Sequence, residues 1–78
     1  MSDVYKQETG GTHYLGLAIT PVEYAMRNRL DFSEGNIVKF VSRHRLKGKD
    51  EDIKKAIDYC KIILHYEYGY TEEQLSKL

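Results

Sequence analysis

Three cationic side chains recur at every fourth position in the middle of this chain. They are Lys39, Arg43 and Lys47, and the segment that contains them is predicted to be helical. Residues four apart on an α-helix are neighbours, so like charges at this spacing repel one another unless something anionic lies against them. Arginine offers an anion a bidentate fork and lysine offers a point charge. The spacing therefore predicts a helix face that binds phosphate.

A second anion site is predicted near the start of the same helix. Ser33 is the candidate N-cap, and Gly35 and Asn36 follow within one turn. The first turn of a helix carries unpaired backbone N–H groups and the positive end of the helix dipole. We therefore expect Asn36 and the backbone at Gly35 to complete an anion site, or Asn36 to contact a ribose or the edge of a base.

The composition limits the classes of protein to which the chain could belong. Its 78 residues make one small domain with a thin core, which self-association would enlarge. The 12 basic and 12 acidic residues leave no net charge, so we do not expect a binder of long nucleic acid. The stretch from Arg27 to Lys49 nevertheless holds seven basic and two acidic residues. This local excess suits a small anion better than a duplex.

Motifs of the familiar nucleotide and metal enzymes are missing from the sequence. It contains no P-loop, no dinucleotide-binding glycine motif and no His-Glu-x-x-His pair. We expect Cys60, the single cysteine, to be a small buried side chain rather than a nucleophile. The acidic run Asp50-Glu51-Asp52 suits the first turn of a helix better than a magnesium site. No metal and no other cofactor is predicted, and a binding protein is favoured over an enzyme.

Capping signals predict an all-α domain of three to four helices over residues 20–78. Thr20 and Glu23 form a capping box with Pro21 at the first helical position, so the first helix should run from Pro21 to about Arg29. Its expected core side chains are Val22, Ala25 and Met26.

Two longer helices and a short one should follow. The second helix is expected to end at Gly48 in a left-handed conformation, and the third to run from an Asp50 cap to Gly69. A capping box at Thr71 predicts a tail helix through Leu78. The expected core positions are Ile37, Phe40, Val41 and His44 in the second helix and Ile53, Ala56, Ile57, Cys60, Ile63 and Leu64 in the third.

A second apolar stripe accompanies the core positions of the third helix. It consists of Tyr59, Ile62 and Tyr66, and it is wider than a small monomer needs. Two interpretations remain: the stripe contacts another subunit, or it is the tyrosine-covered edge of a single core. We predict a homo-oligomer, a dimer or a tetramer.

Residues 1–19 show no regular period and are expected to form an extended N-terminal arm. Tyr14 could stack on a base, with Tyr5 or, outside the arm, Phe32 as weaker candidates, and His13 could hydrogen-bond to a ligand near neutral pH. An arm that packs on a neighbouring subunit is the alternative. Residues 1–11 are too polar for a signal peptide, and no apolar run is long enough to cross a bilayer, which predicts an intracellular protein.

Several of these residues together resemble a family of small phage proteins that was long listed as a domain of unknown function. The resemblance covers roughly residues 12–66, and its most specific part is a Phe-x-x-Gly-Asn-x-x-Lys-Phe-x-x-Arg run from Phe32 to Arg43. The other matching segments are His13-Tyr14, Ile19 to Tyr24, Leu30-Asp31, Asp52 to Ala56, and Tyr59.

The resemblance implies two functions. Some relatives are similar to oligomeric sponges that sequester the cyclic dinucleotides with which bacteria signal infection, and larger ones are described as phage kinases of deoxynucleoside monophosphates that lack a P-loop.

Phosphoryl transfer needs a metal-held donor and groups that stabilise developing charge, a large set for so short a chain. We therefore expect an anti-defence protein that binds a ligand similar to 3′3′-cGAMP without cleaving it and so blocks CBASS effectors. It would act in the cytoplasm of the infected bacterium, with His13, Tyr14, Asn36, Lys39, Arg43 and Lys47 as ligand-binding residues. A nucleotide kinase and a nucleic-acid-binding module remain the alternatives.

Overall fold

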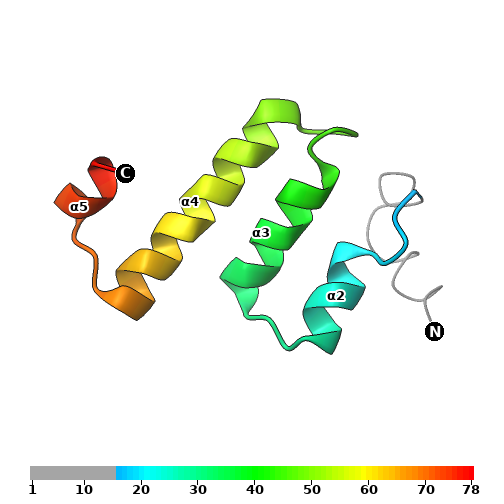
Figure 1. Cartoon of the computed structure of the whole chain (residues 1–78), viewed down its shortest axis with the longest axis horizontal. Helices are drawn as coiled ribbons and strands as arrows, with labels where there is room; N and C mark the ends of the chain where they lie inside the picture. The colour runs from blue at the N-terminus through cyan, green and yellow to red at the C-terminus, as the bar shows by residue number, and fades with distance from the viewer. Residues whose placement is uncertain (1–15) are drawn as a thin grey trace.

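A computed structural model describes residues 16–78 of the chain, and this part is built from helices alone. The four helices are α2 (Pro21–Arg27), α3 (Phe32–Arg43), α4 (Lys49–Tyr68) and α5 (Glu72–Ser76). Helices α2, α3 and α4 lie side by side in one layer, each antiparallel to the next, and α5 lies beyond the outer edge of α4 (Figure 1). The predicted all-α fold class is thus confirmed for the described residues.

Helix α2 has the predicted N-cap but only half of the predicted capping box, because the Glu23 carboxylate accepts from Arg27 at 3.3 Å instead of from the backbone of Thr20. The Thr20 hydroxyl accepts a hydrogen bond from the backbone N–H of Glu23 at 3.2 Å, and Pro21 occupies the first turn, where a missing N–H costs nothing. The helix ends at Arg27, two residues before the predicted end, because Arg29 adopts a left-handed φ of 56° and turns the chain toward α3. Met26, an expected core residue, is 65% exposed, so its placement in the core was wrong.

The N-cap of helix α3 lies two residues before the predicted one. Asp31, not Ser33, is the N-cap: its carboxylate accepts from the N–H of Glu34 at 2.9 Å, and the Glu34 carboxylate accepts from the N–H of Asp31 at 2.9 Å. This reciprocal capping box outcompetes a serine that offers a single acceptor. Asn36 consequently lies beyond the first turn, and its amide donates to the carbonyl of Phe32 at 2.8 Å. Asn36 therefore lies outside the first turn, whose backbone N–H groups were expected to form the anion site.

The connection between α3 and α4 differs from the prediction. Helix α3 ends at Arg43, so Lys47 lies in the connecting segment and does not extend the helical row of cations. Gly48 has an ordinary φ of −88°, and it is Lys49 that adopts the left-handed conformation, with φ 53°. Gly48 serves as the N-cap of α4 without a side-chain bond, so Asp50 is not the cap. At the other end, the left-handed Gly69 terminates α4 and the Thr71 capping box starts α5, as predicted.

The single layer leaves little room for a core. Among apolar side chains of the described residues, only Pro21, Phe40 and Ala56 are buried. Cys60 is exposed and Ile57 is 49% exposed, so the predicted placement of both in the core was wrong. Tyr59 takes the position against α3 instead, with its ring stacked on that of Phe40 at 6.0 Å between centroids. For Tyr59, the interpretation as an edge of the core is the correct one.

Candidate functional site

A cluster of cations forms where α3 packs against α4. Three positive groups lie against the ring of the buried Phe40: Nζ of Lys39 at 4.5 Å from the ring centroid, Cζ of Arg43 at 5.0 Å and Nζ of Lys55 at 5.4 Å. A cation over an aromatic face is attracted by the negative face of the ring. Phe40 thus holds three like charges close together, and we call Lys39, Arg43 and Lys55 the cationic cluster.

Sequence reasoning found two members of the cationic cluster and missed Lys55. Lys55 comes from α4, three residues after Asp52, and reaches the cluster because α4 folds back against α3. Spacing of three places it on the same side of α4 as Asp52. The sequence signal for Lys55 would have been an ion pair between Arg43 and Asp52, because that pair fixes which side of α4 faces the cations.

The row of cations was predicted to need an anion, and for Arg43 this anion is the carboxylate of Asp52. This carboxylate accepts from Nε of Arg43 at 3.0 Å and from Nη2 at 3.2 Å, and also from the backbone N–H of Gly48 at 3.1 Å. The Asp52 side chain is buried, and that of Arg43 is 15% exposed. The hydrogen bond from Arg43, opposed by desolvation and reinforced by the charge of Arg43, holds the pKa of Asp52 below its usual 3.8.

This ion pair requires a residue without a side chain at position 48. A Cβ placed on Gly48 would overlap the carboxylate of Asp52, which approaches the backbone there to accept its hydrogen bond. Gly48 is therefore explained by a close approach and not by its backbone angles.

Replacing Gly48 by alanine is expected to lower the free energy of unfolding by about 1–3 kcal/mol, because the added methyl group must displace a carboxylate that is fixed by three hydrogen bonds. Urea denaturation followed by circular dichroism measures this loss. Gly16→Ala is the matched control, since a Cβ at Gly16 meets nothing within 4 Å. Equal losses in the two variants would contradict the structural reason given for Gly48.

Lys39 experiences a net positive field despite the nearby carboxylate. Burial lowers the pKa of Lys39 from 10.5, and the charges of Arg43 and Lys55 lower it further; Asp52 acts in the opposite direction. Lys47 also lowers the pKa of Lys39, so the loop lysine contributes to the field although it is off the helix. An anion bound at Lys39 would relieve this repulsion.

An apolar groove adjoins the cationic cluster on the side of α2. It has a volume of about 380 Å³, and its lining includes Ala25 and Met26 of α2 and Phe32, Asn36 and Lys39 of α3. The two helices pack closely here, since a Cβ at Gly35 would lie in ordinary van der Waals contact with Cβ of Ala25, at 3.5 Å. The groove therefore offers an apolar wall with an amide and an ammonium group at its rim.

Aromatic rings connect the groove with the cluster. Phe32, 75% exposed, meets the edge of Tyr59 at 5.9 Å between centroids, and Tyr59 stacks on Phe40. A planar group bound in the groove would thus lie beside exposed aromatic surface, and an attached anion would lie within reach of Lys39.

The structure brings together part of the predicted site. Asn36 and Lys39 line one groove, and Lys39 and Arg43 share the cationic cluster. Lys47 is exposed in the connection between α3 and α4. The predicted contributions of His13 and Tyr14, and of Tyr5, lie outside the described residues.

The described residues contain neither a cluster of metal ligands nor a membrane-spanning helix. Within residues 16–78, no three side chains of the His, Cys, Asp or Glu types gather as a metal would require. In the same part of the chain, no helix has both the length and the apolar character of a membrane span.

Comparison with known proteins gives one match. The model of a family described as a protein of unknown function (DUF3310) matches residues 8–61. The matched region contains α2, α3, the connection to α4 and most of α4, and so all residues of the cationic cluster and the groove. No curated protein and no solved structure matches the chain.

Proposed function

The chain belongs to the DUF3310 family, and we propose that it binds the phosphates of a nucleotide on its cationic cluster. The ligand in this proposal is a cyclic dinucleotide similar to 3′3′-cGAMP, held without cleavage. The chain would then be a phage protein that withholds this signal from CBASS effectors in the infected bacterium.

The gathering of three cations around one ring carries the proposal. Lys39 and Lys55 each place Nζ within 5.4 Å of the Phe40 centroid, and the charge of Lys55 lowers the pKa of Lys39, so we expect one phosphate to interact with both. Asp52 neutralises Arg43, which leaves the two lysines as an excess of positive charge. Placing like charges together costs free energy in the absence of a ligand, and an anion turns that repulsion into binding energy. Arg43 acts here mainly by fixing α4 against α3, with its charge as a secondary contribution.

The groove beside the cluster supports a nucleotide rather than a bare phosphate. A base could lie against Met26 and Phe32, with Asn36 at its edge and its phosphate toward Lys39. Base–aromatic stacking contributes about 1–3 kcal/mol per base. A cyclic dinucleotide has two bases and two phosphates, so two subunits could bind its two halves with the same residues.

The carboxylate nearest to the cations favours binding over phosphoryl transfer. Both oxygens of Asp52 accept hydrogen bonds from Arg43, and one of them also accepts from Gly48. A carboxylate engaged in this way acts as a structural anion, whereas phosphoryl transfer uses carboxylates to hold the metal ions of the donor.

The direct test incubates the purified chain with a panel of cyclic dinucleotides and cyclic trinucleotides and, separately, with deoxynucleoside monophosphates, ATP and magnesium. After the protein is denatured, chromatography identifies what was bound and whether it changed. We expect an intact cyclic dinucleotide to be recovered from the protein fraction. Formation of nucleoside diphosphate would instead establish a kinase and overturn the proposal.

Salt dependence separates a pocketed ligand from a long polyanion. Two phosphates should give a shallow loss of affinity with increasing salt, whereas DNA or RNA releases many counterions and gives a steep one. A steep dependence, together with no retained cyclic nucleotide, would favour the nucleic-acid-binding module.

A further inference from the structure

The side of the layer opposite the cationic cluster is apolar. On α3, Val38 points away from Asn36 and Val41 points away from Lys39, because helical residues two positions apart differ by about 200° around the axis. Val38 and Val41 line a shallow cavity of about 390 Å³ together with Ile37 and, from α2, Tyr24.

Helix α4 extends this apolar side. Asp52, Lys55 and Tyr59 occupy the side of α4 toward the cationic cluster. By the helical period of 3.6 residues, the opposite side carries a second row of apolar residues. We define the back face of the layer as Tyr24, Ile37, Val38 and Val41 together with Ile53, Ile57, Cys60 and Leu64 of α4.

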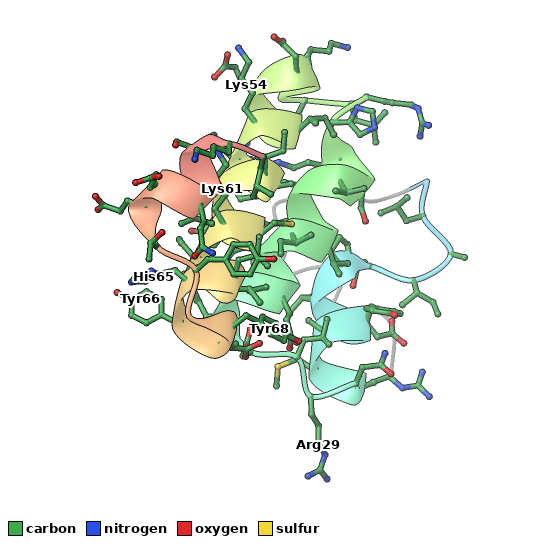
Figure 2. All side chains as sticks on the ribbon, turned by 60° about the vertical axis from the view of Figure 1, so that its left-hand side comes forward. Arg29, Lys54, Lys61, His65, Tyr66 and Tyr68 are labelled. Carbon is green, nitrogen blue, oxygen red and sulfur yellow. The ribbon has the colours of Figure 1, made fainter. Side chains whose placement is uncertain are left out.

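Much of the back face is exposed in the described part of the chain, where four of its eight side chains are exposed and the other four are partly buried. Tyr24, Val41 and Ile57 are 47%, 48% and 49% exposed, and Cys60 is exposed as well. The charged residues of α4 lie elsewhere: in Figure 2, Lys54, Lys61 and His65 follow one another along the outer part of the helix. A continuous apolar surface of this kind is uncommon on a soluble monomer and marks an interaction site.

We propose that a second copy of this chain covers the back face. The two copies then form a two-layer dimer with both cationic clusters on the outside. Three observations select a second copy as the partner. The first is size: the Cα atoms extend 43 by 26 Å in the plane of the layer and 15 Å across it, so the full outline of one face, α5 included, is roughly 1,100 Å², large enough to contain a standard interface of about 800 Å² per partner.

The second observation is chemical, since a surface of aliphatic side chains and one tyrosine is complementary to itself and can pair about a two-fold axis. The third concerns the core, because the described residues bury only Pro21, Phe40 and Ala56 among their apolar side chains. Stacking two layers converts the exposed back faces into the core that each layer lacks. Residues 1–15 are a poor substitute, because only Met1, Val4, Tyr5, Tyr14 and Leu15 among them are apolar.

This dimer differs from the one that the sequence suggested. The predicted contact through Ile62 and Tyr66 involves residues that line a groove between α4 and α5, away from the back face. The dimer is also independent of the proposed ligand, since neither lysine of the cationic cluster belongs to the interface. A cyclic dinucleotide shared by two clusters would therefore join subunits of two different dimers.

Sedimentation equilibrium of the full chain tests the proposal. We expect a mass twice the 9.1 kDa of the chain, and a return to 9.1 kDa in Ile57→Glu and in Val41→Glu. Asp58→Lys is the matched control, because Asp58 is exposed on α4 beside Ile57 but outside the back face, and it should leave the dimer intact. Circular dichroism of each variant shows whether its helices persist.

The native Cys60 provides a second measurement without any substitution. In the dimer its thiol is covered, so the rate of reaction with a bulky maleimide should fall about tenfold as protein concentration rises through the dimerisation range. A 9.1 kDa species at all concentrations would overturn the proposal, whether Cys60 reacts fast or is protected by another segment of its own chain. A dimer that survives both back-face variants but is broken by Tyr66→Glu would place the interface elsewhere and also overturn it.

Discussion

Replacing Arg43 by alanine is expected to lower the free energy of unfolding by about 3 kcal/mol, because the variant leaves the buried carboxylate of Asp52 without its charged partner. This loss is a large fraction of the stability of a small domain, so the helix content should fall as well. The sequence alone assigned Arg43 to the residues that bind the ligand. The Arg43–Asp52 pair revises that expectation, and it means that a loss of binding in this variant would say little about ligand contacts.

A double-mutant cycle with Arg43→Ala and Asp52→Ala measures the interaction by urea denaturation. A coupling free energy of at least about 1.5 kcal/mol is expected for the pair. Lys77→Ala provides the control, because its ion pair with Glu73 joins side chains that are 72% and 79% exposed, and its removal should cost no more than about 0.5 kcal/mol. Similar costs at the two pairs would contradict the structural role of Arg43.

The same pair sets an acid limit for stability. The pKa of Asp52 lies below 3.8 in the folded chain, so its contribution is complete above that value and disappears as pH falls through the lowered pKa. The loss of stability on acidification should therefore be smaller in Asp52→Asn than in the wild type. Urea denaturation midpoints of the two proteins, measured at neutral and at acidic pH, test this.

Reversing charge in the cationic cluster is expected to have the largest effect on binding. Lys39→Glu and Lys55→Glu should each weaken the affinity for the cyclic dinucleotide by roughly 100-fold, because each removes a charge-assisted contact and adds repulsion. Isothermal titration calorimetry with the ligand recovered from the panel gives these values. Lys54→Glu is the control: Lys54 neighbours Lys55 but is paired with Asp50 and Glu51 and should bind normally. Equal losses at positions 54 and 55 would indicate a general charge effect and would contradict the assigned site.

The wild-type affinity should also depend on alkaline pH. Because the pKa of Lys39 is below 10.5, this lysine loses its proton at lower pH than an ordinary lysine. Phosphate binds the protonated form, so affinity should stay level near neutrality and decline as pH rises through the lowered pKa. The decline should be weaker in Lys39→Arg, whose guanidinium keeps its charge.

The sequence predicted the helices more accurately than their packing. The capping signals at Thr20, Gly69 and Thr71 act within a few residues, and each is found where it was expected. At Asp31 the prediction failed because a reciprocal capping box outcompeted the serine two residues later. Local signals thus located helices to within about a turn.

What could not be predicted was which side of each helix faces its neighbour. Apolar residues occur on more than one side of α4, so periodicity alone could not choose between Cys60 and Tyr59 as the core residue. The choice depends on Asp52, whose ion pair with Arg43 rotates α4 so that Tyr59 faces Phe40. For the same reason the predicted row of cations was only partly right. Lys39 and Arg43 lie together with Lys55, and Arg43 already has an anionic partner in Asp52.

The short segment between Arg43 and Asp52 has a consequence for how this chain folds. Only nine positions separate the two charges, and the backbone of Gly48 is bonded within the same turn. Closing so small a loop costs little conformational entropy, and contacts between residues near in sequence favour fast folding. The hairpin of α3 and α4 should therefore be the first native unit to form and the last to exchange its amide hydrogens. Because the cationic cluster lies within that hairpin, it is assembled before the rest of the layer and before any second subunit arrives.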